Sequence, residues 1–186
     1  MAILRFNTVQ DMFDAYPTAE GDVGRPGSAV PSVNFIGELM KENDWGAAIA
    51  FCAYLLPRRV AVAWGCRSLR RTLSVASADD DKALAFAEAW VDQPEEAQRR
   101  KALALGNQSN MRSPTTWLAL GAGWSGGSVV PIESGHVATN AEQTARAVWV
   151  ALSIALSRLP KTDANKTVRA WLEDGIRLAN GEPASR

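Results

Sequence analysis

Residues 43–73 read NDWGAAIAFCAYLLPRRVAVAWGCRSLRRTL, and this stretch decides the class of the fold. Asn43 or Asp44 can cap a helix over residues 45–56, whose apolar residues lie on all sides, as in a buried central helix. Pro57 then takes the first position of a second helix, where its missing N–H group costs nothing. That helix carries one apolar stripe, formed by Val62, Cys66, Leu69 and Leu73. The stretch predicts two consecutive helices, one buried and one amphipathic.

Similar signals recur on both sides of this stretch. Capping residues precede helically spaced apolar residues at Thr8, Ser32, Ser113 and Thr139. The aspartates at 79–81 suit the positive end of another helix. After Pro94, the i,i+4 pairs Glu95 with Arg99 and Glu96 with Arg100 predict a solvated surface helix. We therefore expect an all-α protein, a compact irregular bundle of seven to nine helices, with at most one short strand near the N-terminus.

The domain organisation follows from the length and from the placement of glycine and proline. A chain of 186 residues is the size of one ordinary domain. Glycines and prolines crowd residues 18–31, which predicts a linker. We expect an N-terminal segment over 1–17 that packs on the domain, the linker over 18–31, a helical domain over 32–181, and a tail over 182–186.

Composition excludes several classes of function. Lysine plus arginine and aspartate plus glutamate are both 20, and this balance argues against nucleic-acid and anionic-membrane binding. Two cysteines, Cys52 and Cys66, and one histidine predict no disulfide framework and no metal site. The longest uncharged apolar run has twelve residues, where a membrane span needs about 20. With no signal peptide at the N-terminus, we expect a cytoplasmic protein without membrane insertion.

Two motifs resemble catalytic or cofactor sites, and we interpret both structurally. Residues 121–126, Gly-Ala-Gly-Trp-Ser-Gly, fit the spacing of a dinucleotide fingerprint, but they end a predicted helix and follow no strand. Ser134 and His136 could form a nucleophile and a base, but no orienting acid follows closely. We expect no enzyme activity and no cofactor. An enzyme or small-molecule binder that uses the arginines and His136 is the alternative.

Two features are candidate binding surfaces. One is a helix that carries five arginines and no acidic residue, namely Arg58, Arg59, Arg67, Arg70 and Arg71. These side chains can bind carboxylates of a partner, or they can pair with the acidic helix starts at 79–81 and 95–96. The other is a loop of small residues that follows two tryptophans, with candidates Trp124, Ser125, Gly126 and Gly127. Trp117 and Trp124 either belong to the core or anchor a partner.

Three motifs together resemble a family of small bacterial proteins of unknown function. Residues 55–66 match its Leu-Pro-Arg-Arg-x-Ala-x-x-Trp-x-Cys motif, which includes Arg58, Arg59 and Trp64. Residues 13–17 resemble the end of its N-terminal helix, and residues 124–128 with Pro131 resemble its Trp-Ser-Gly-Gly-Ser loop. The resemblance spans residues 2–177 and implies no activity, cofactor or catalytic residue.

The resemblance implies a role linked to type VI secretion, since such proteins are associated with gene neighbourhoods of that system and its cargo. We expect a non-enzymatic protein–protein interaction module, an adaptor or chaperone whose partner is a secretion-system component or effector. An immunity protein that neutralises a toxin is an alternative, because that role also needs only a complementary surface.

Overall fold

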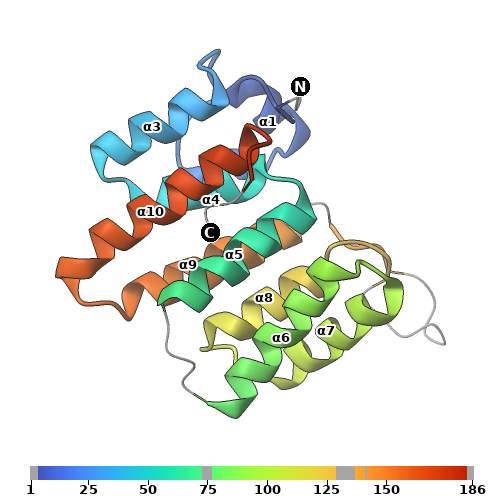
Figure 1. Ribbon diagram of the computed structural model, residues 1–186. Helices are drawn as coiled ribbons and strands as arrows, with labels where there is room; N and C mark the ends of the chain where they lie inside the picture. Colours follow the sequence, from blue (N-terminus) through green and yellow to red (C-terminus); the bar gives the residue numbers. More distant parts are fainter. Residues whose placement is uncertain (1–3, 73–76, 129–136, 141, 184–186) are drawn as a thin grey trace. The chain divides into compact units, whose positions relative to one another are not determined.

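The computed structural model describes residues 4–72, 77–128, 137–140 and 142–183, and these residues form ten helices (Figure 1). In those ranges the strand-like pairings are two isolated bridges, Thr8 with Pro31 and Ser128 with Ala138. The predicted all-α class is confirmed. Nine of the helices lie in segments where the sequence predicts one, and the tenth lies in the segment expected to be a linker. No helix of the described chain is long and apolar enough to cross a membrane.

The described chain forms two compact units. The first contains residues 1–57 and 156–186, and the second contains residues 58–155. These boundaries divide the 32–181 segment, which the sequence presents as one helical domain. The first boundary follows Pro57, and the second lies inside a long helix, so no change of composition marks either one.

The first unit packs its helices around aromatic side chains. Phe51 lies at the centre, with its ring centroid 4.8 Å from that of Phe35 and 6.3 Å from that of Phe13. The unexpected helix α2 also belongs to this unit: its Ala19 and Val23 are buried, and the Tyr54 hydroxyl donates to Asp22 at 2.5 Å. The helices of this unit are α1 (Val9–Ala15), α2 (Ala19–Val23), α3 (Ser32–Glu42), α4 (Trp45–Leu55) and α10 (Lys161–Ala179).

Some of the predicted helix starts are observed, and others lie a few residues away from the observed ones. Thr8 forms a capping box with Asp11, and Asp44 accepts from the Ala47 N–H group, as the sequence predicts. Ser32 is not a cap: it is the first residue of α3, and its hydroxyl is buried without a hydrogen-bond partner. Thr139 is not a cap either, because the helix that follows begins only at Gln143. In both cases the sequence places a cap near the right segment but not at the residue that starts the helix.

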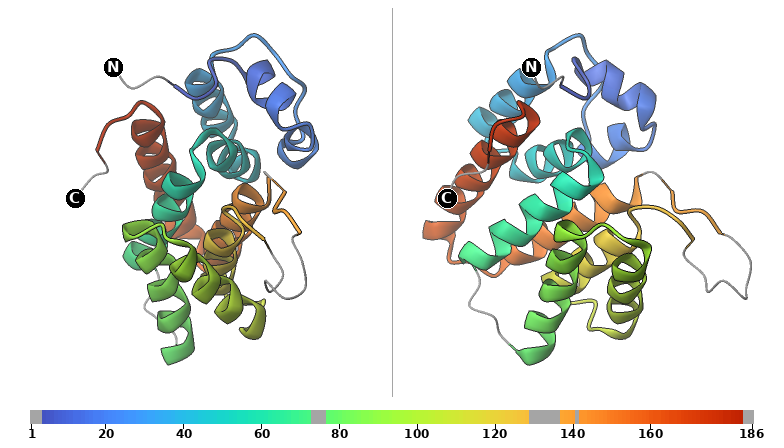
Figure 2. Two further views of the ribbon diagram at one scale, coloured as in Figure 1. Left: turned by 90° about the vertical axis from the view of Figure 1, so that its right-hand side faces the viewer. Right: turned by 45° about the vertical axis from the view of Figure 1, so that its right-hand side comes forward.

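The second unit brings together helices that follow one another in the chain. Figure 2 shows α6, α7 and α8 side by side, and each of these three contacts the other two. Ser77 caps α6, and the aspartates at 79–81 occupy its first turn, as predicted. The helices of this unit are α5 (Arg58–Thr72), α6 (Ala78–Asp92), α7 (Glu96–Gln108), α8 (Pro114–Gly123) and most of α9 (Gln143–Ser157).

Glycines allow α7 and α8 to approach closely. A Cβ atom placed on Gly123 would lie 2.7 Å from the Cα atom of Leu103, and one on Gly106 would lie 2.7 Å from Leu120 Cδ2. Gly121 lies within α8 as well, and the Thr144 hydroxyl of α9 donates to its carbonyl at 3.1 Å. The glycine-rich run is therefore a helix-packing element and not a turn between a strand and a helix, and the sequence analysis is right that no strand precedes it in the described chain.

We predict that Gly123→Ala destabilises the protein by about 1–3 kcal/mol, because the added methyl group would push against the backbone of α7. Gly46→Ala is the matched control. Gly46 is exposed in α4, and a Cβ atom there meets nothing within 4 Å. That change should raise the free energy of unfolding by about 0.5–1 kcal/mol. Urea denaturation of both variants measures the difference, and equal stability of the two would contradict the close approach of α7 and α8.

Candidate functional site

The loop after α8, residues 124–128, is called the WSGGS loop here. The sequence places the end of the preceding helix at Gly126 and Gly127, but α8 ends earlier, at Gly123. The Trp124 N–H group still bonds to Leu120 O at 2.7 Å, and the chain then leaves the helix. Gly127 has φ +64°, in the left-handed region that favours glycine. The small residues thus shape a turn beyond the helix instead of ending it.

A buried arginine holds this loop from α7. Arg99 is 3% exposed, and its side chain donates from Nη1 to Gly123 O and from Nη2 to Ser128 O, the latter at 3.0 Å. Glu96 binds the same guanidinium through both carboxylate oxygens at 2.7 Å. One side chain therefore fixes both ends of the WSGGS loop. Gly127 also lies against this group, since a Cβ atom there would be 2.9 Å from Arg99 Nη2.

The expected pairing of Arg99 with Glu95 on a solvated surface is wrong. Glu95 is the extended N-cap of α7, so it lacks the helical geometry that an i,i+4 pair requires. Arg99 instead lies on the buried face of α7, together with Ala102, Leu103 and Gly106. The expected pair of Glu96 with Arg100 is present, at 2.7 Å.

A second arginine holds the middle of the loop. Arg58, the first residue of α5, donates from Nη1 to Ser125 O at 2.6 Å across 67 positions of sequence. Together, Arg58 and Arg99 bind three carbonyl oxygens that lie on or beside the WSGGS loop. Such charge-assisted hydrogen bonds are stronger than neutral ones. The arginine helix and the loop, which the sequence presents as separate candidates, therefore meet in one site.

The far end of the loop is closed by backbone pairing. The Thr139 N–H group bonds to Gly127 O at 3.3 Å, and the Val137 N–H group bonds to the Ser128 hydroxyl at 3.1 Å. The sequence also singles out Ser134 and His136, which lie outside the described residues.

Two tryptophans beside the loop are partly accessible. The rings of Trp117 and Trp124 meet edge to face, with centroids 6.4 Å apart, and both side chains are half-buried. The indole N–H group of Trp117 donates to Met111 O at 2.8 Å, and Met111 is 49% exposed. By contrast, Trp64 of the Leu-Pro-Arg-Arg motif is 1% exposed and belongs to the core. The aromatic pair thus offers surface to solvent while it stays rigidly packed.

Other arginines of α5 bind within the protein. Arg59 donates to Val91 O at 2.6 Å and to Asp92 O at 3.2 Å, at the C-terminal end of α6. Arg70 binds Glu88 through two hydrogen bonds and Asp81 through a third at 2.6 Å. The bond from Arg70 to Asp81 fits the alternative in which the arginines pair with the acidic start of the next helix, whereas Arg59 binds the opposite end of α6. Arg71 is exposed on α5, and Arg67 lines a pocket between α5 and α6.

Both cysteines of the chain are buried. Burial raises the pKa of the Cys52 and Cys66 thiols, so neither is an activated nucleophile. The described ranges contain no group of three or more histidine, cysteine, aspartate or glutamate side chains placed to hold a metal ion. The sequence analysis missed Glu96, Arg99 and Met111 as parts of the site. One feature of the sequence does indicate that Arg99 is buried, because Ala102, Leu103 and Gly106 follow it at the spacing of one helix face.

We predict that Arg99→Met lowers the free energy of unfolding by about 2–3 kcal/mol, because the carbonyls of Gly123 at the end of α8 and of Ser128 in the loop lose a charged donor in a buried place. Arg100→Met is the matched control, since Arg100 lies on the same helix and binds the same Glu96 near the surface. That change should cost less than about 0.5 kcal/mol. Chemical denaturation measures both. Equal losses for the two variants would show that Arg99 does not anchor the loop.

We predict that lowering the pH from 4.5 to about 2 weakens the pairing of Glu96 with Arg99, because Glu96 takes up a proton in this range. The hydrogen bond from Arg99 is the main cause that lowers the pKa of Glu96 from 4.5 to about 2. A carboxylate with a lowered pKa stabilises the fold above its ordinary pKa, and this stabilisation is lost as the pH falls through the lowered value. Glu96→Gln should therefore melt below the wild type at pH 6, and the two melting temperatures should converge between pH 4.5 and about 2. Glu95→Gln is the control and should keep the wild-type pH dependence. A constant difference for Glu96→Gln down to pH 2 would contradict this account.

Comparison with known proteins assigns a family but no activity. No curated protein matches this chain, and no solved structure matches it. One family model matches residues 35–179, which is most of the 186-residue chain and includes both α5 and the WSGGS loop. Its description reads "Family of unknown function (DUF6931)". The chain belongs to this family.

Proposed function

We propose that this protein is a non-enzymatic interaction module that presents the WSGGS loop and the Trp117–Trp124 pair to a protein partner. The observation that carries the proposal is the anchoring of the loop by two arginines from different helices, Arg58 and Arg99. Their hydrogen bonds go to backbone carbonyls, so they hold the shape of the loop, in which Ser128 is buried, Ser125 and Gly126 are half-buried and Gly127 is exposed.

A loop of fixed shape suits recognition for an energetic reason. Binding costs free energy when it immobilises loops and long side chains, and prior ordering reduces that cost. Half-buried tryptophans have little conformational freedom left to lose, and tryptophan is enriched among residues that dominate interfaces. Gly126 is half-buried and Gly127 is exposed, so a partner can approach the backbone closely.

The cellular role we propose is that of an adaptor or chaperone for a component or effector of a bacterial secretion system, in the cytoplasm. This part of the proposal rests on the resemblance to proteins in type VI secretion neighbourhoods. An immunity protein would use the same surface against a toxin, so the identity of the partner separates the two roles.

We predict that Trp124→Ala abolishes the capture of a partner by the tagged protein from extracts of its native host. Loss of a tryptophan at the centre of an interface costs about 2 kcal/mol or more, which is roughly thirtyfold in affinity. Trp45→Ala is the matched control, because Trp45 is also half-buried but belongs to α4 in the other unit. Mass spectrometry of the captured proteins identifies the partner.

The result supports the proposal if one protein is captured reproducibly by the wild type and by Trp45→Ala but not by Trp124→Ala. A secretion component would favour the adaptor, and a toxin would favour the immunity role. An insertion of two glycines after Gly127 should also prevent capture, whereas the same insertion after Gly181 should not. Capture that survives both loop changes would contradict the proposed surface.

A further inference from the structure

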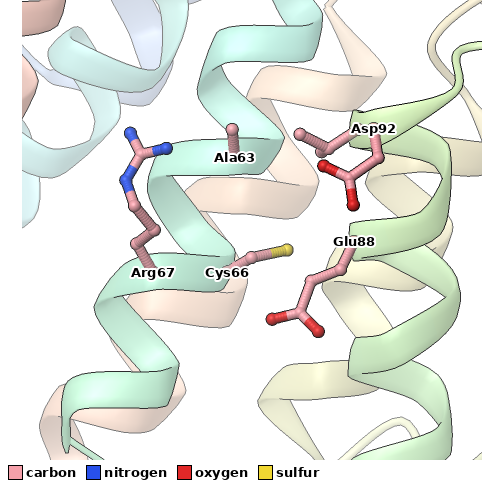
Figure 3. A pocket seen from close by; sticks show the side chains of 6 residues that line it. Ala63, Cys66, Arg67, Glu88 and Asp92 are labelled. Carbon is pink, nitrogen blue, oxygen red and sulfur yellow. The ribbon is translucent and has the colours of Figure 1, made fainter. Parts of the chain in front are cut away.

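A pocket lies between α5 and α6, apart from the WSGGS loop, and Figure 3 shows it from close by. Its volume is about 310 Å³, enough for the side chain of a partner or a small organic molecule. Three residues of each helix line it, namely Ala63, Cys66, Arg67, Glu88, Val91 and Asp92. All six belong to the second unit.

Part of the lining is apolar and uncharged. Ala63 and Val91 contribute apolar side chains, and Cys66 of the Leu-Pro-Arg-Arg motif points from α5 toward α6 (Figure 3). Cys66 is 3% exposed, and burial raises its pKa, so the thiol stays neutral. This lining suits an alkyl chain, because the transfer of apolar surface out of water is favourable.

Two carboxylates lie on the α6 side of the pocket. Glu88 and Asp92 are one helical turn apart, and both extend from α6 toward α5 (Figure 3). Arg70 holds Glu88 through two hydrogen bonds of 2.9 and 2.8 Å, so this carboxylate is fixed in orientation. Asp92 is exposed and is the last residue of α6, where the negative end of the helix dipole disfavours another negative charge. Arg59 already places one cation at this end of α6, on the carbonyl oxygens of Val91 and Asp92, so a ligand cation would bind the side-chain carboxylate of Asp92 instead.

The arginines near the pocket leave room for such a cation. Arg59 bonds to the backbone carbonyls of Val91 and Asp92, and Arg70 is shared between Glu88 and Asp81. In Figure 3 the guanidinium group of Arg67 lies on the side of α5 away from the two carboxylates. The charged side chains on the α6 side of the pocket, Glu88 and Asp92, are therefore both acidic.

We propose that this pocket binds an alkyl chain that ends in a cation, which is the chemistry of a lysine or arginine side chain. The chain would cover Ala63, Cys66 and Val91, and the cation would lie between Glu88 and Asp92. This site does not depend on the proposed role of the WSGGS loop, because a free ligand of this chemistry can occupy it without any protein partner.

The test is a titration of the full chain, followed by backbone NMR, with n-butylammonium and n-butylguanidinium chloride. The amide signals of Ala63 and Val91 should shift in a saturable way, with a dissociation constant on the order of millimolar for so few ligand atoms. Binding should weaken as salt is added. Uncharged n-pentanol, which has a similar length, should give no saturable shift at the same concentrations.

Variants locate the site. Asp92→Asn should weaken binding about tenfold or more, the loss expected when a charged hydrogen-bond partner is removed. Asp79→Asn, at the other end of α6, should bind like the wild type. Ala63→Leu, which fills part of the pocket, should abolish binding, and unchanged melting temperatures show that the variants are folded. The absence of saturable shifts, equal binding of n-pentanol, or wild-type affinity in both Asp92→Asn and Ala63→Leu would overturn the proposal.

A further titration separates the two sources of the cation. Tripeptides Gly-Lys-Gly and Gly-Arg-Gly with blocked ends present the same side chains from a peptide backbone. If they bind at least as tightly as the butyl cations, the pocket takes a side chain of a partner protein. If only the butyl cations bind, the ligand is a small molecule. Neither result depends on the host-extract experiment, so a failure of the proposed loop surface would be recognised separately.

Discussion

The second unit depends on one buried charge, the guanidinium group of Arg99. A buried arginine is costly unless its charge and its N–H groups are satisfied, and here Glu96 supplies the opposite charge while the carbonyls of Gly123 and Ser128 accept hydrogen bonds. The guanidinium group and the carbonyls that it binds depend on each other. The carbonyls can stay in place only where the guanidinium reaches them, and the guanidinium can stay buried only if the WSGGS loop keeps its shape. The face of α7 that carries Arg99 can therefore be buried only when the loop has this conformation.

Helix packing sets the position of this charge. Gly123 meets the backbone of Leu103 and also offers its carbonyl to Arg99, so one residue serves the contact between α7 and α8 and the anchor of the loop. Gly127 has a similar double role, since its left-handed backbone and its missing Cβ atom both make room for the same guanidinium. Glycine at these positions reflects the close approach of a large cation and a neighbouring helix, not flexibility.

The Leu-Pro-Arg-Arg motif now has a physical explanation. Its first arginine, Arg58, bonds to the WSGGS loop, and its second, Arg59, bonds to the last carbonyls of α6. Trp64 fills the core, and Cys66 lines the pocket between α5 and α6. The Leu-Pro-Arg-Arg motif and the WSGGS loop, which are far apart in sequence, are joined directly by the hydrogen bond between Arg58 and Ser125 O.

The sequence by itself determined the helical class and some helix starts, such as those capped by Thr8 and Asp44, because capping residues and apolar spacing are local signals that act within a few residues. It also pointed to Arg58, Trp124 and the glycines of the loop. Tertiary structure alone decided that Arg99 is buried, since the i,i+4 rule describes an isolated helix and cannot show which face another helix covers. It likewise decided that α2 forms in a segment rich in glycine, where Ala19 and Val23 are buried and Asp22 accepts a hydrogen bond from Tyr54. Hydrogen bonds between residues distant in sequence leave no periodic pattern, and such bonds build this site.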